Sequence, residues 1–234
     1  MSRRENASSG GSSSPIAKYL RWHGDGHVEY YDKDTKANVT QESVELVVLD
    51  IRNSVTGWSE DNKSQITSNM VKDISKEELT VKPFKGREIA KGLWKDIKET
   101  VNKAEGKYTV NLICLAKIDG TWEIANLQLV ASNLAEWMTF RESTTEAEIF
   151  DGLLVVSEGE RRKKGATKFT VPAFGLKKLD AKLDKQAEEA YNRVKAYFEG
   201  FREESRTSNA STAPKAQEPE TNIGSDNEPD DLPF

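Results

Sequence analysis

Two stretches of this sequence have the apolar pattern of β-hairpins. Apolar and aromatic runs at Ile16–Trp22 and His27–Tyr31 lie on either side of the turn Gly24-Asp25-Gly26. Asp119-Gly120 separates two more runs, and an Asp-Gly pair suits the two positive-φ positions of a type I′ turn. The runs on either side of Asp119-Gly120 are predicted strands at Tyr108–Ile118 and Thr121–Leu129. Further strands are predicted at Val44–Ile51, Ile66–Ile74, Leu79–Phe84, Phe150–Ser157 and Lys168–Phe174.

Helical periodicity occurs in three other segments. Within Gly86–Ala104, apolar residues recur every four positions and form one stripe. A short helix at about 131–142 and a final helix at about 178–203 have apolar residues at three- and four-residue spacing. We therefore expect a mainly β, or α+β, domain of roughly seven to nine strands. An oligonucleotide-binding-type barrel with helical insertions fits this pattern, although a strand count does not establish closure.

Composition sets the boundaries of this domain. Residues 1–15 and 205–234 are low in apolar content and rich in Ser, Asn, Pro and Glu. They are predicted to be a disordered arm and a disordered acidic tail, leaving one domain at 16–204. Residues 1–15 also lack the apolar segment of a secretory signal, so a cytoplasmic location is expected.

The negative charge of the chain is concentrated at one end. The chain of 234 residues has a net charge of −5, but residues 216–234 hold six acids and no Lys or Arg. The preceding residues are thus close to neutral, and their cations can still bind nucleic acid where they cluster. Cys114, the single cysteine, is expected in the core, which excludes disulfide frameworks and cysteine-based zinc sites. No apolar run approaches the roughly 18 residues of a membrane span.

Catalytic patterns are not recognised. The glycine-rich segments lack the Gly-Lys-Ser/Thr ending of a phosphate loop, and there is no Gly-x-Ser-x-Gly motif. His23 and His27 flank Asp25 and could hold a metal, but a polar hairpin tip with incidental histidines is the favoured alternative. Three further acids, Asp61, Asp73 and Glu78, have no recognised nuclease spacing. We expect a protein that is not an enzyme and uses no cofactor or metal.

Two groups of cations are candidates for binding nucleic acid. Within the predicted helix, Arg87, Lys91, Lys95 and Lys98 would project into one sector and could follow a phosphate backbone. A solvated basic face is the alternative. Four consecutive cations, Arg161, Arg162, Lys163 and Lys164, occupy a predicted hairpin tip, where they repel one another. A hairpin that wraps nucleic acid explains them better than stability does, although a solvated charge run remains possible.

Aromatic side chains could stack on bases, because every base has a π-face. Alternation puts Tyr30 and Tyr31 on opposite sheet faces, so at most one of them is exposed. Trp58, in a polar stretch, is the first candidate for an exposed ring, and Trp122 the second. The predicted stacking residues are Trp22, Tyr31, Trp58 and Trp122, whereas Trp94 and Trp137 are expected to be structural.

The chain ends in Asp230-Asp231-Leu232-Pro233-Phe234. This ending resembles the C-terminal tail of bacterial and phage single-stranded DNA-binding proteins. The segments Ala17–Tyr31 and Val47–Trp58 and the Asp119-Gly120 hairpin also look like the body of the phage-encoded proteins, over about residues 16–175. The resemblance implies an oligonucleotide-binding fold, single-stranded DNA as a partner, and replication or recombination proteins recruited by the tail. It also implies the cytoplasm of an infected bacterial cell.

The resemblance leaves several alternatives open. The body is larger than the bacterial domain, so tetramerisation does not carry over, and a monomer or homodimer is expected. A recombination mediator or strand-annealing protein would have the same groove. A scaffold protein with a docking tail would have no DNA role, and the tail could be an ordinary solubility tail. A metal-dependent nuclease is the least favoured alternative.

Overall fold

The computed structural model describes residues 14–210, and the side chains of residues 14–200. The predicted arm and most of the predicted tail therefore lie outside the described residues. Residues 205–210, which were expected to belong to the tail, are instead helical. The chain divides into two units, residues 1–198, which contain the sheet, and residues 199–234.

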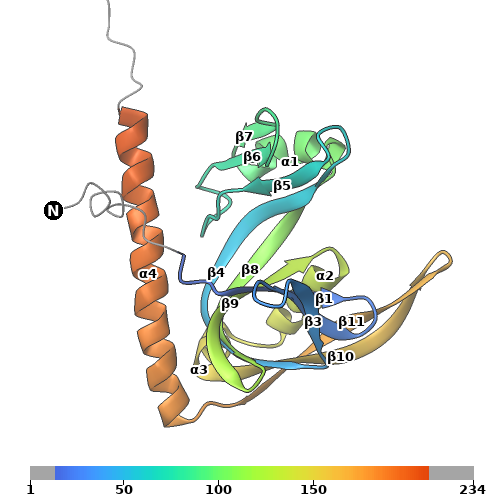
Figure 1. Cartoon of the computed structure of the whole chain (residues 1–234), viewed down its shortest axis with the longest axis vertical. Helices are drawn as coiled ribbons and strands as arrows, with labels where there is room; N and C mark the ends of the chain where they lie inside the picture. The colour runs from blue at the N-terminus through green and yellow to red at the C-terminus, as the bar shows by residue number, and fades with distance from the viewer. Residues whose placement is uncertain (1–13, 211–234) are drawn as a thin grey trace, which may run out of the picture. The chain divides into compact units, whose positions relative to one another are not determined.

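The described residues form eleven strands and four helices (Figure 1). The strands are β1 (Lys18–His23), β2 (His27–Asp32), β3 (Ala37–Gln41), β4 (Val44–Ser59), β5 (Ser64–Ser68), β6 (Leu79–Pro83), β7 (Ala90–Gly92), β8 (Gly106–Ile118), β9 (Thr121–Val130), β10 (Gly152–Lys164) and β11 (Thr167–Lys178). The helices are α1 (Trp94–Lys103), α2 (Ser132–Glu142), α3 (Glu146–Asp151) and α4 (Ala181–Ala210).

The long strand β4 joins the two parts of the sheet. One edge of β4 pairs with β8 along most of its length. The other edge pairs with β10 at Val44–Leu46 and with β5 at Thr56–Ser59. The strand order is therefore β3-β2-β1-β9-β8-β4-β5-β6-β7, with β10 and β11 branching from β4. The strands β1, β2, β3, β9, β10 and β11, with the adjoining parts of β4 and β8, are here called the larger sheet. The strands β5, β6 and β7, with the remaining parts of β4 and β8, are called the smaller sheet (Figure 1).

Three apolar clusters pack against these sheets. The first fills one face of the larger sheet and includes Trp137 of α2 and Ile149 of α3. The second lies on the opposite face, where Leu183 and Val194 of α4 cover it. The third lies between the smaller sheet and α1. Both faces of the larger sheet are thus covered, which explains the nearly continuous burial along β4 and β8.

A mainly β fold with helices is confirmed, but a closed barrel is not, because the sheet is open. The turn between β1 and β2 approaches β11 through two hydrogen bonds. The backbone N–H of Thr170 donates to Gly24 O at 2.7 Å, and Trp22 Nε1 donates to Thr170 O at 2.9 Å. These two bonds do not form a ladder, so the strands stop short of closure.

Both predicted hairpins are confirmed as β1–β2 and β8–β9. At the β8–β9 turn, Asp119 and Gly120 have φ angles of 49° and 81°, as a type I′ turn requires. Cys114 is buried as expected, and burial raises the pKa of its thiol to about 12. None of the described helices is both long and apolar enough to cross a membrane.

Other predicted elements were wrong in part. The predicted helix at Gly86–Ala104 begins only at Trp94, because β7 first pairs with β6. Gly86 and Gly92 have φ angles of 133° and 150°, which no helix contains. The strand predicted at Ile66–Ile74 ends at Ser68. Phe150 belongs to α3 and not to a strand. The short elements β3, β7 and α3 were not predicted.

Candidate nucleic-acid interface

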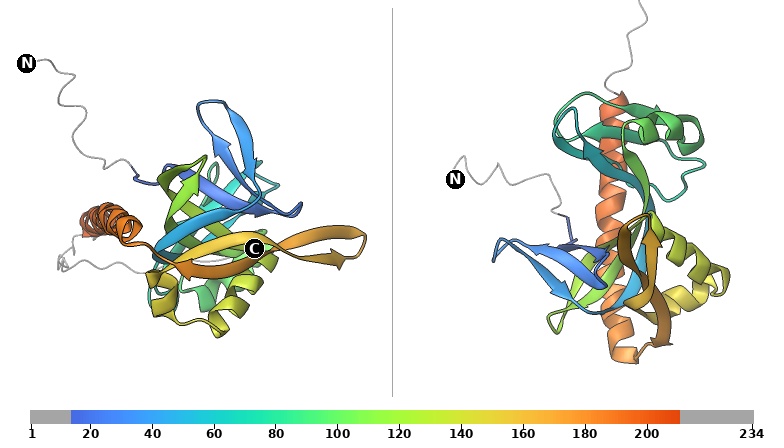
Figure 2. Two further views of the ribbon diagram at one scale, coloured as in Figure 1. Left: turned by 90° about the horizontal axis from the view of Figure 1, so that it is seen from below. Right: turned by 90° about the vertical axis from the view of Figure 1, so that its right-hand side faces the viewer.

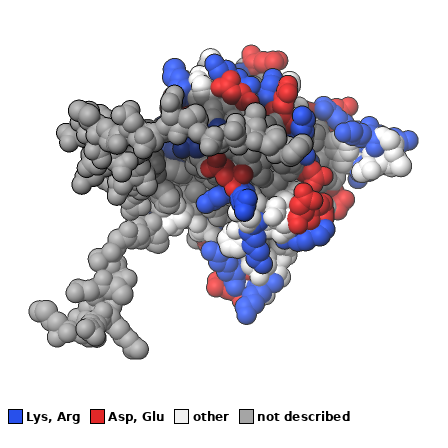
Figure 3. Space-filling model, turned by 90° about the horizontal axis from the view of Figure 1, so that it is seen from above, with Lys and Arg blue, Asp and Glu red and all other residues white. Residues whose placement is uncertain are grey.

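The β10–β11 hairpin extends away from the sheet and ends at Gly165 (Figure 2). Gly165 has a φ of 61°, so it supplies the left-handed conformation that the turn needs. A bulge interrupts the pairing between Glu158 and Arg161. Within this bulge, a Cβ on Gly159 would lie 2.7 Å from Val171 O, so only glycine fits. In Figure 3, Lys and Arg cover much of the projecting hairpin tip.

The register of this hairpin divides its cations between two faces. Arg161 pairs with Thr170, and Lys163 pairs with Lys168. Directly opposed residues share a face, as do residues two apart on a strand. Arg161, Lys163 and Lys168 therefore lie on one face, here called the basic face of the hairpin. All three side chains are exposed, and none has an ion-pair partner among the described residues.

Arg162 and Lys164 lie on the other face. Arg162 Nη1 is 2.6 Å from Glu136 Oε1 of α2, and Arg162 Nε is 3.3 Å from Glu160 Oε2. These two carboxylates already compensate the charge of Arg162, which connects the hairpin to α2. The four consecutive cations are therefore not equivalent. Arg161, Lys163 and Lys164 remain unpaired within the described part, and Lys168 is an addition that the sequence run did not indicate.

The predicted basic stripe at residues 87–98 is not a helical stripe. Lys95 and Lys98 lie on α1 and are exposed, as predicted. Arg87 lies in an irregular segment, and Lys91 lies in β7 opposite Thr80 of β6. The four cations are exposed, but they do not project from one helix face. Only Lys95 and Lys98 keep the helical spacing on which the prediction rested.

The aromatic candidates divide into buried and exposed rings. Trp22 was a wrong prediction, because it is only 5% exposed and its Nε1 is bonded to Thr170 O. Tyr31 and Trp58 are 51% and 50% exposed, so both rings are accessible to a base. Trp122 is partly buried against the cluster beneath α4. Three further exposed rings, Tyr19, Phe84 and Tyr191, are not among the predicted stacking residues.

The predicted opposition of Tyr30 and Tyr31 is confirmed. Tyr30 is buried, and its hydroxyl donates to Asp119 Oδ2 at 2.5 Å. Burial, and then this hydrogen bond, raises the pKa of Tyr30 above its ordinary value. Its neighbour Tyr31 faces solvent.

His23 and His27 interact with each other at the tip of the β1–β2 hairpin, and His23 also interacts with Asp25. The rings of His23 and His27 stack with centroids 4.9 Å apart, and His23 Nδ1 is 3.2 Å from Asp25 Oδ2. Over residues 14–200, no group of three or more His, Cys, Asp or Glu side chains has the arrangement of a metal site.

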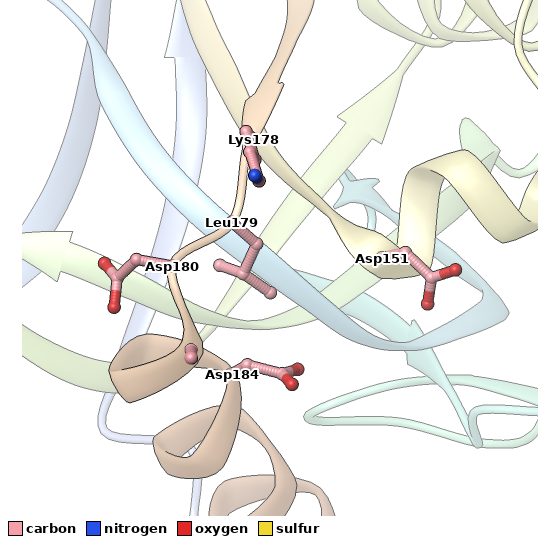
Figure 4. A pocket seen from close by; sticks show the side chains of 6 residues that line it. Asp151, Lys178, Leu179, Asp180 and Asp184 are labelled. Atoms are coloured by element: carbon pink, nitrogen blue, oxygen red, sulfur yellow. The ribbon is translucent and has the colours of Figure 1, made fainter.

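A pocket where β11 leads into α4 has no set of acidic side chains that point toward one common position. It is lined by Asp151, Lys178, Leu179, Asp180, Ala181 and Asp184. Figure 4 shows the carboxylates of Asp151 and Asp180 pointing away from each other. Asp180 Oδ1 accepts hydrogen bonds from the backbone N–H groups of Lys182 and Leu183, both at 2.9 Å, and so caps α4. Asp180 and Asp184 belong to the start of α4, whereas Asp151 ends α3, and all three carboxylates would repel phosphates.

The predicted partner-binding residues, Asp230, Asp231, Leu232, Pro233 and Phe234, lie outside the described residues. Comparisons with known proteins add no assignment: no protein-family model, curated protein or solved structure matches the chain.

Proposed function

We propose that this protein binds single-stranded DNA with little sequence preference and protects it during phage DNA replication or recombination. The observation that carries the proposal is the basic face of the hairpin. Three exposed cations point to one side of a projecting β-hairpin with no described carboxylate to neutralise them. Such cations are suited to binding the phosphates of a nucleic acid. Binding is favourable because it releases the counterions that had condensed on those phosphates.

Phosphate contacts position a strand without reading its sequence. Stacking on exposed rings such as Tyr31 and Trp58 is equally tolerant of sequence. The curled, open sheet would then hold the strand in the manner of an oligonucleotide-binding fold. No catalytic step is required of this arrangement.

The tail sequence has a separate role in this proposal. Asp230-Asp231-Leu232-Pro233-Phe234 combines acids with an aromatic residue beside proline, which suits docking into a basic pocket with an apolar floor. We propose that it recruits replication or recombination proteins in the infected cell. Its acids would also compete with DNA for the cations of the body.

Deleting residues 216–234 is therefore expected to raise the affinity for oligo(dT) at low salt, because six competing acids are removed. The gain should shrink as salt screens the acids. Fluorescence anisotropy of a labelled oligonucleotide measures both effects. Replacing the six acids by Asn and Gln in the full chain is the matched control and should reproduce the gain. Unchanged or weaker binding by both variants would contradict the competition.

The proposed function itself is tested by comparing labelled single strands with a duplex of equal length. We expect tighter binding to oligo(dT) and to a mixed-sequence single strand than to the duplex, because only unpaired bases present their faces for stacking. Equal affinity for single strand and duplex would contradict the proposal. In parallel, faster annealing of complementary strands would assign the chain to strand-annealing proteins, and absence of all DNA binding would favour the scaffold.

A further inference from the structure

The smaller sheet carries two exposed aromatic residues in one cross-strand row. Trp58 of β4 is directly opposite Gln65 of β5. The backbone N–H of Phe84, just after β6, donates to Gln65 O at 2.8 Å and continues the same register. Trp58, Gln65 and Phe84 therefore lie side by side on one face of the sheet.

This face is not part of the core. On the opposite face, Val55, Ile66 and Val81 are fully buried in the cluster beneath α1. Trp58 and Phe84 remain 50% and 83% exposed. Exposed rings on this face contribute little to folding, because they bury little apolar surface. A binding partner would account for them.

The next row on the same face is polar and ends in cations. Thr56 of β4 is opposite both Lys107 of β8 and Thr67 of β5, and Thr67 is opposite Lys82 of β6. The hydroxyl of Thr56 is 2.7 Å from that of Thr109. Lys82 and Lys107 are exposed, and neither has an ion-pair partner among the described residues. The face therefore has rings in one row and phosphate-binding groups at both ends of the adjacent row.

We propose that this aromatic face (Trp58, Gln65, Phe84, Lys82 and Lys107) is a second nucleic-acid contact that binds a short single-stranded segment. Trp58 and Phe84 stack on bases, Gln65 donates to and accepts from a base edge, and the two lysines bind the flanking phosphates. The rings are two strands apart, about 10 Å, so each receives its own base. The proposal rests on the proposed function, because it extends the same strand beyond the hairpin.

An apolar protein partner fits this face less well. Between and beside the rings lie the amide of Gln65, the hydroxyl of Thr67 and two lysines, and an apolar partner would leave these groups without hydrogen bonds or counterions. Nucleic acid supplies both a π-face for each ring and an anion for each lysine. The chemistry of the face therefore favours a single-stranded nucleic acid.

The test uses the full chain and its binding to oligo(dT) at fixed salt. Trp58→Ala and Phe84→Ala should each weaken binding by roughly 10-fold, with little change in the salt dependence, because stacking involves no counterion release. The double variant Lys82→Gln/Lys107→Gln should reduce the log–log salt slope by about 1.4, or about 0.7 for each lost phosphate contact. Met138→Ala, which removes a 49% exposed apolar side chain from α2, is the control and should bind as the unaltered protein does.

A spectroscopic readout separates stacking from a loss of structure. Trp58 is more exposed than the other four tryptophans, so oligo(dT) should quench mainly its emission. Trp58→Phe should retain most of the affinity but lose most of the quenching. If the alanine variants bind normally and quenching persists without Trp58, the aromatic face is not a contact, while the hairpin proposal stands. If the unaltered protein does not bind oligo(dT), both proposals fail.

Discussion

Replacing Arg161, Lys163 and Lys168 together by glutamine is expected to lower the affinity for oligo(dT) by roughly 10- to 100-fold at about 50 mM salt. The reason is the geometry of the hairpin, whose register puts these three cations on one face. Each lost phosphate contact should reduce the log–log salt slope by about 0.7, so the slope should fall by about 2. Anisotropy titrations of labelled oligo(dT) at several salt concentrations measure both quantities.

The matched control changes net charge equally at another place. Lys182→Gln/Lys185→Gln/Lys195→Gln removes three exposed cations from α4. It should leave the slope unchanged within error, because α4 is not part of the proposed contact. Equal losses in the two triple variants would show that net charge alone governs binding, and the basic face of the hairpin would not be a specific contact.

Trp137→Ala is expected to destabilise the protein more than Trp58→Ala, Phe84→Ala or Met138→Ala, and to lower the free energy of unfolding by about 3–5 kcal/mol. Trp137 of α2 is fully buried, and its ring lies 5.3 Å from that of Phe174 and 5.6 Å from that of Phe140. Alanine would leave a cavity where α2 packs against the larger sheet. Urea denaturation followed by far-UV circular dichroism measures the loss.

Met138→Ala on the same helix is the comparison. Met and Ala have similar helix propensities, and the side chain that this substitution removes is exposed. Its effect should stay within about 0.5 kcal/mol. A cost for Trp137→Ala similar to that of Met138→Ala would contradict the packing of α2 into the core.

Local signals in the sequence were reliable where one physical cause dominated. The Asp119-Gly120 turn was predicted because two adjacent positive φ angles favour few residue pairs, and both angles are present. The apolar run at Val44–Ile51 was identified as a strand, but its extension to Ser59 was not. Beyond Ile51 the residues of β4 are mostly polar, so the strand depends on its partners β8 and β5.

Tertiary context decided the sites that the sequence did not reveal. Apolar spacing from Ile89 onward fits a helix, yet the pairing of β7 with β6 holds that segment extended until Trp94. Trp22 is an aromatic residue like the other stacking candidates, but it is buried and bonded to Thr170, 148 positions away, a tertiary contact that the local sequence does not contain. Phe84 belongs to the aromatic face, and Lys168 to the basic face of the hairpin, only because of the register between neighbouring strands. No single stretch of sequence contains that register.

The central claim is that single strands bind through phosphate contacts. Its most direct test is a titration of the full chain with oligo(dT) at about 50 mM and about 200 mM salt. We expect clear binding at the lower concentration, a marked loss of affinity at the higher one, and quenching of tryptophan emission. No binding at about 50 mM salt, or an affinity that salt does not change, would contradict the account.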